Sequence, residues 1–74
     1  MTLDELRPGE TARVVGLDGD PAIVQRLASF GLLPEVEVEV IRRAPTGDPL
    51  EIELLGYRLS LRRAEAAGVR VERG

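Results

Sequence analysis

Residues 35–40 read EVEVEV, and this strict alternation is the pattern that decides the fold. A period of two residues is typical of a β-strand with one buried face, so the valines are predicted to point inward and the glutamates outward. Residues 50–54 (LEIEL) and 57–61 (YRLSL) alternate in the same way on either side of a two-residue turn. Both are predicted to be strands, with inward side chains at Leu50, Ile52, Leu54, Tyr57, Leu59 and Leu61.

One helix of useful length is predicted before these strands, over residues 21–30. Asp20 is a favourable N-cap, and Pro21 suits the first helical position because its missing N–H would be unpaired there anyway. Ile23, Leu27 and Phe30 follow helical spacing and are expected to face the core, and Gly31 is expected to take the left-handed conformation beyond the helix end.

Shorter elements complete the predicted fold. Thr2 and Glu5 have the spacing of a capping box, which predicts one helical turn over residues 3–6. Residues 11–17 predict a strand with a bulge at Gly16, residues 64–67 a helical turn, and residues 69–72 a last strand. About five short strands joined by tight loops predict a mainly β domain with one helix, an SH3-like small, partly open barrel spanning residues 1–74 as a single domain.

The composition excludes most kinds of catalytic and metal-binding site. The 74 residues contain no Cys, His or Trp, and all ten basic residues are arginine. Zinc sites with thiolate or imidazole ligands, nucleophiles activated by histidine, Schiff bases and phosphate-loop lysines are therefore all excluded. We expect no enzyme and no cofactor. The net charge of −3 and 3% aromatic content also argue against nucleic acid as a partner.

A family resemblance covers nearly the whole chain. Its segments are LDELRPGE, ARVVGLDGD, QRLASFGLLP, VEVIRRAPTGDPLEIEL and GYRLSLRRAEAAGVRVE, starting at residues 3, 12, 25, 38 and 56. In this order they resemble the FeoA family of small ferrous iron transport accessory proteins. The resemblance implies an SH3-like barrel, transition metal ion binding as a family property, and action beside a FeoB-like membrane transporter with a GTPase domain. It also implies a cytoplasmic location, peripheral at the inner membrane through that partner, without direct membrane insertion. Two departures are Glu35, where relatives usually carry Gly, and Val24, where they often carry a polar residue.

Two carboxylates are weak candidates for a metal site. If Val40 pairs with Ile52, then Glu39 lies opposite Glu53, with Arg58 beside them. Such a pair offers oxygen ligands to a hard cation, but ferrous iron usually also takes imidazole or thiolate. We therefore expect a solvated face and no specific iron binding by the isolated chain.

The segment after the helix is the best candidate for binding a partner. Its short loop carries two leucines, and either both are exposed or the first packs under the barrel. The predicted partner-binding residues are Val24, Arg26, Gly31, Leu32, Leu33 and Pro34. An apolar patch of several hundred Å² would mark such an interface, and a transporter's cytosolic domain or a second copy of this chain could occupy it.

A different class of function stays open. The same module is similar to the carboxy-terminal domain of some iron-dependent repressors, so the chain could be a stand-alone regulatory interaction domain. That alternative predicts affinity for a proline-rich or winged-helix partner and none for a GTPase domain. A third alternative, a nucleic-acid-binding barrel, would need a basic cluster of Arg42, Arg43, Arg62 and Arg63.

Overall fold

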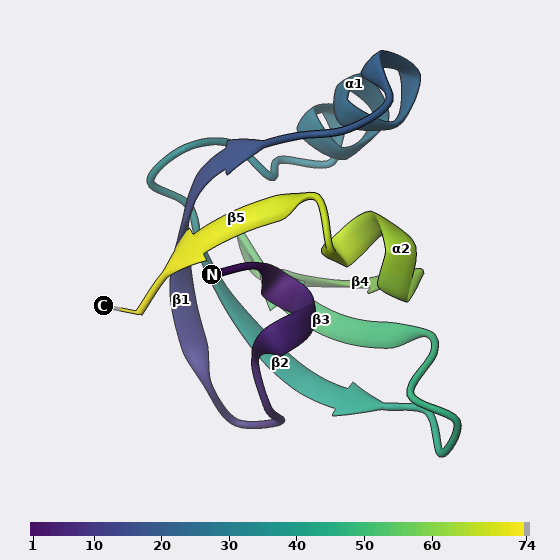
Figure 1. The fold of residues 1–74 in the computed structure, drawn as a ribbon. Coiled ribbons are helices and arrows are strands. Elements are labelled where there is room, and N and C mark those ends of the chain that lie inside the picture. Colours follow the sequence, from purple (N-terminus) through teal and green to yellow (C-terminus); the bar gives the residue numbers. More distant parts are fainter. Residues whose placement is uncertain (74) are drawn as a thin grey trace.

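The computed structural model describes residues 1–73, which form five β-strands, two α-helices and one 3-10 turn (Figure 1). In chain order these are η1 (Leu3–Glu5), β1 (Thr11–Leu17), α1 (Pro21–Ser29), β2 (Glu37–Arg43), β3 (Leu50–Leu54), β4 (Tyr57–Leu61), α2 (Arg63–Ala66) and β5 (Val69–Glu72). Every strand and helix predicted from the sequence is present, with ends that differ by at most a few residues.

The strands form one antiparallel sheet in the order β4-β3-β2-β1-β5. The expected register holds, because Val40 pairs with Ile52 and Glu39 pairs with Glu53. A register shift between Val14 and Gly16 confirms the bulge in β1. The bulge leaves Leu17 partly buried against the core, although it is out of phase with the rest of the strand.

The curved sheet encloses one apolar core that contains no buried polar or charged residue among those described. Fifteen side chains form it: Leu3, Leu6, Ala12, Val14, Leu27, Leu32, Val38, Val40, Leu50, Ile52, Leu54, Leu61, Ala66, Val69 and Val71. Every strand contributes to this set. Leucine, isoleucine and valine dominate, as expected for a small domain that must close its core without disulfides.

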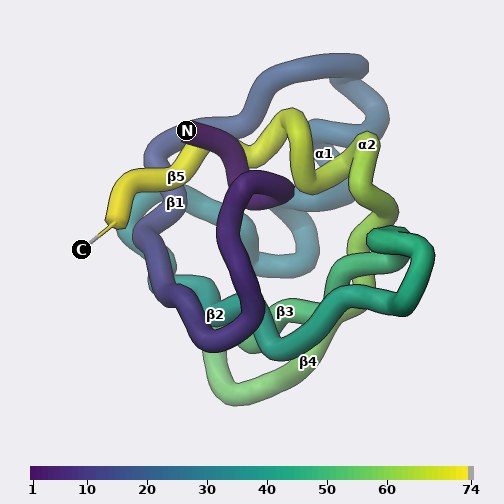
Figure 2. Tube along the Cα trace, turned by 60° about the horizontal axis from the view of Figure 1, so that its bottom comes forward, coloured from purple at the N-terminus to yellow at the C-terminus, as the bar shows by residue number. Residues whose placement is uncertain are grey.

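The two edges of the sheet differ. The amino-terminal segment covers β5, since Thr2 forms a bridge with Arg70 and the Val71 N–H donates to the Met1 carbonyl (2.9 Å). Figure 2 shows this segment running beside β5. β4 ends the sheet on the other side, and no strand of the described chain pairs with its outer edge.

The strand predicted from EVEVEV begins later than expected. Glu35 has a φ of +78°, which is outside the extended region, so β2 starts at Glu37 and continues to Arg43. Val36 packs against the core from the loop, while Val38 and Val40 are buried as predicted.

The predicted core face of α1 is wrong for two of its three residues. Leu27 is buried, but Ile23 is 39% exposed and Phe30 is 37% exposed. The reason is geometric: seven residues of helix span roughly 10 Å, α1 lies beyond the end of β1 (Figure 1), and Leu27 is the buried residue of this helix. Tyr57, also predicted inward, is 39% exposed on the edge strand β4, and its hydroxyl donates to the Phe30 carbonyl.

Candidate partner-binding site

Four of the six predicted partner-binding residues lie at the carboxyl end of α1 and in the loop that follows it. Leu33 is 48% exposed and Pro34 is exposed, whereas Leu32 is fully buried. Gly31 is half-buried. The first leucine of the loop therefore packs in the core and cannot contact a partner, which corrects the prediction for that residue.

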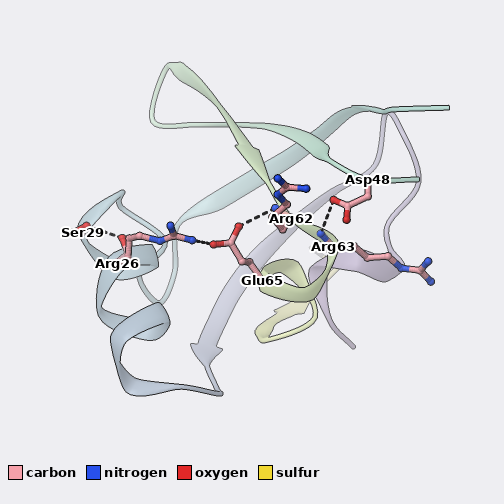
Figure 3. A network of polar contacts seen from close by, with 6 residues as sticks. All are labelled: Arg26, Ser29, Asp48, Arg62, Arg63 and Glu65. Atoms are coloured by element: carbon pink, nitrogen blue, oxygen red, sulfur yellow. Dashed lines mark hydrogen bonds and ion pairs between the residues drawn. The ribbon is translucent and has the colours of Figure 1, made fainter. Parts of the chain in front are cut away.

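The remaining two residues lie on α1 itself. Val24 is half-buried, and the Arg26 side chain is about half exposed. The guanidinium of Arg26 does not project freely, because it pairs with the carboxylate of Glu65 on α2 (Figure 3). Arg26 thus joins the two helices, and it lies in a groove beside β4 rather than at the rim of an exposed leucine.

Residues from the β3–β4 hairpin extend the apolar surface around this loop. The Tyr57 hydroxyl donates to the Phe30 carbonyl, and the Leu55 side chain lies over the Cα of Gly31. Leu55 is 66% exposed. Phe30, Leu33, Leu55 and Tyr57 are referred to below as the apolar end patch.

Gly31 is what allows the loop and the hairpin to come this close. Its φ is +102°, and a Cβ at this position would lie 2.6 Å from the Leu55 Cδ1 atom. A side chain would therefore meet both an unfavourable backbone conformation and a steric clash. The prediction that Gly31 takes a left-handed conformation is confirmed. Gly31 also leaves space for the Leu55 side chain to pack against the loop.

The strand register brings Glu39 and Glu53 opposite each other, as expected. Arg58 lies opposite Glu53, and its Nε atom is 3.4 Å from the carboxylate oxygen. Within residues 1–73 no three carboxylates, histidines or cysteines come together in a way that could hold a metal ion. The donor set is thus two glutamates, one of them already neutralised, which does not fit a metal that needs more ligands.

Two of the four arginines that a nucleic-acid-binding cluster would need are engaged by other groups of the chain. Arg42 pairs with Glu51 (3.1 Å), and Arg43 donates to the carbonyls of Asp4 and Leu6. Most of the other arginines also lie beside carboxylates. The barrel surface is a mixture of both charges, which does not attract a polyanion strongly.

Two glutamates near the amino terminus have a lowered pKa. The Glu5 carboxylate accepts a hydrogen bond from the Thr2 N–H (2.6 Å), and this bond is the main cause that lowers its pKa below 4.5. A hydrogen bond from the Arg7 N–H (2.7 Å) lowers the pKa of Glu10 in the same way. Both groups hold the first turns of the chain in place, and neither belongs to the apolar end patch.

Phe30, Leu55 and Tyr57 were missing from the predicted site. Leu55 carried a usable signal, since an apolar residue in a two-residue turn has no neighbours of its own to bury it. No helix of the described residues is long and apolar enough to cross a membrane.

Comparison with known proteins gives the family context. The family model described as "FeoA domain" matches residues 1–73. A curated fusion protein of Porphyromonas gingivalis, Fe(2+) transport protein A joined to the Fe(2+) transporter FeoB, is 33% identical over 72 residues. That match covers 97% of this chain but only 8% of the fusion protein.

Solved structures show the same fold. FeoA from Chlorobium tepidum is 40% identical with a TM-score of 0.92, covering 99% of this chain and 70% of the other. Stenotrophomonas maltophilia FeoA, described as a prokaryotic SH3 domain protein and solved in complex with zinc, is 33% identical with a TM-score of 0.86, covering 97% and 89%. A manganese-dependent transcriptional repressor has a TM-score of 0.90 over 99% of this chain and 36% of its own, but at 21% identity it shows likeness of fold alone.

Proposed function

The chain belongs to the FeoA family, and we propose that it is a non-enzymatic accessory protein of ferrous iron transport that binds the cytosolic part of a FeoB-like transporter. The observation that carries the proposal is the Porphyromonas gingivalis fusion, in which a domain similar to this chain is covalently joined to FeoB. Fusion keeps two domains at high effective concentration, which is useful when they work in contact. On this proposal the chain acts in the cytoplasm, held at the inner membrane through its partner.

The apolar end patch is the surface we propose for this contact. Its four side chains are between 37% and 66% exposed and come from two segments fixed to each other by the Tyr57 hydroxyl and the packing of Leu55 on Gly31. A preformed apolar surface loses little conformational entropy on binding. Burying the exposed part of each side chain would contribute about 1 kcal/mol.

The proposed mechanism is binding that differs between conformations of the transporter. A ligand shifts an equilibrium only by the difference in its affinity for the two states, so the patch would favour the state that presents a matching apolar surface. Iron is the transporter's cargo here. No step needs a metal held by this chain, in keeping with the poor fit of Glu39 and Glu53 to a metal site.

The first experiment measures binding to the purified cytosolic GTPase domain of the FeoB-like transporter by titration calorimetry. Leu33→Asp should weaken binding at least tenfold, because it places a charge in a desolvated contact. Glu37→Gln, an exposed change on β2, is the matched control and should bind like wild type. Equal binding by Leu33→Asp would rule out the patch.

Two other results would support a different function or a different partner. Absence of binding to the GTPase domain together with binding to a winged-helix protein would favour the regulatory-domain alternative. Concentration-dependent dimerisation that is abolished by Leu33→Asp would assign the patch to self-association instead.

A further inference from the structure

β4 presents a row of unpaired backbone groups. Leu54 and Tyr57 flank the two-residue turn and pair with each other, so hydrogen bonds to β3 alternate along β4 from Tyr57. The N–H and C=O groups of Arg58 and Ser60 therefore point away from the sheet. No backbone group within residues 1–73 bonds to them. The opposite edge, β5, is covered by the amino-terminal segment, which makes β4 the free edge.

A groove runs along this free edge. It has a volume of about 400 Å³ and lies between β4 and the end of α1. Its lining combines apolar and polar side chains: Phe30, Pro49, Leu59 and Leu61 with Arg26, Ser60, Arg62 and Glu65. An edge strand beside an apolar groove is the arrangement that binds extended peptides by strand addition.

The charge of the groove is positive. Glu65 is its one acidic residue, and the Glu65 carboxylate is already engaged by the Arg26 guanidinium and by the Arg62 N–H (2.9 Å; Figure 3). The Glu65 side chain is only 10% exposed. The Arg62 guanidinium forms no ion pair with any described residue, so it is available to a ligand.

We propose that β4 binds an extended acidic peptide segment as an added strand. Side chains of the added strand that lie opposite Arg58 and opposite Arg62, one residue beyond β4, share the outer face with these arginines. Acidic residues suit both positions: the first would share Arg58 with Glu53, and the second would meet the unpaired Arg62 guanidinium. Those opposite Leu59 and Leu61 point into the groove toward Phe30 and should be apolar. The recognised pattern is acidic–apolar–any–apolar–acidic, five residues long.

A second copy of this chain does not fit the same edge. Pairing β4 with β4 of another molecule about Ser60 places Arg58 of one copy opposite Arg62 of the other. Like charges directly opposite each other destabilise a strand pair. This charge arrangement favours an acidic segment of a different chain over self-pairing.

The test uses the full chain and the blocked peptide GSEVTVESG as probe, followed by amide chemical shifts and hydrogen exchange. We expect saturable binding, with the Ser60 amide becoming protected. The charge-reversed peptide GSKVTVKSG should bind at least tenfold more weakly. A peptide N-methylated at threonine, which removes one bond to the edge opposite Ser60, should lose affinity to a similar extent.

Ser60→Pro removes the outward N–H while leaving the bonds to β3, a substitution that edge strands tolerate. It should reduce affinity at least tenfold, and Ser60→Ala should not. Arg62→Glu, which keeps the backbone unchanged, should weaken binding of the acidic probe and strengthen binding of the basic one.

Undetectable binding at millimolar peptide, or equal affinity of the N-methylated peptide, would overturn strand addition. Protection of Ser60 that rises with protein concentration in the absence of peptide would show self-pairing instead. Because the probe is a peptide and the groove lies beside β4, failure here leaves the transporter contact of Leu33 and Leu55 standing.

Discussion

Position 35 shows how one residue sets the start of a strand. Its φ of +78° lies in the region that glycine adopts freely and that costs other residues about 1 to 2 kcal/mol. Glu35 is placed here nonetheless, with its carboxylate 3.4 Å from Arg13 Nε. That ion pair is largely exposed and screened, so it offsets little of the backbone cost. The positive φ is the physical reason why glycine would suit this position better than glutamate.

Replacing Glu35 should reveal this cost. Glu35→Gly removes the steric strain and Glu35→Ala keeps it, so the glycine variant should be more stable than the alanine variant by about 1 kcal/mol. Chemical denaturation of both variants measures the difference. An alanine variant as stable as the glycine variant would show that the positive φ carries no cost here.

At the scale of elements, the strands could be predicted from the sequence and the packing of the helix could not. The two-residue period of a strand determines which of its side chains are buried. The two-residue turn at Leu55-Gly56 determines the register between β3 and β4. The helical period of α1 identifies a helix, yet the buried area depends on how much of it reaches the barrel. Leu27 reaches the barrel and is buried, whereas Ile23 does not reach it and is exposed.

The turn η1 depends on pH through Glu5. Its pKa is lowered from 4.5 in the folded protein, mainly by the Thr2 N–H, so the unfolded chain binds the proton first on acidification. The carboxylate therefore stabilises the fold above pH 4.5, and this contribution is lost as the pH falls through the lowered folded value.

Thermal unfolding of Glu5→Gln should accordingly give a lower midpoint than wild type at pH 7, and the difference should shrink below pH 4. Glu37→Gln serves as the control, because Glu37 is exposed on β2 and far along the chain from η1. A difference between Glu5→Gln and wild type that persists unchanged at pH 3 would contradict the assigned role.

At the scale of the whole molecule, surfaces form from segments that are distant in sequence. Leu33 was predicted from its own loop, but Leu55 and Tyr57 join it only because the β3–β4 hairpin folds beside the end of α1. Sequence periodicity describes each element separately and carries no information about the contact between the hairpin and the loop after α1. The expected carboxylate pair, by contrast, followed from strand register alone and is confirmed in position, with Arg58 beside it.

The apolar end patch is the surface proposed to contact the cytosolic domain of a FeoB-like transporter. The most direct measurement is amide chemical-shift mapping of this protein, isotopically labelled, during titration with that domain. We expect the largest changes at residues 30–33 and 55–57, and we expect them to saturate with the added domain. Saturable changes centred on the outer face of β2 and β3, with residues 30–33 and 55–57 unaffected, would contradict this proposal.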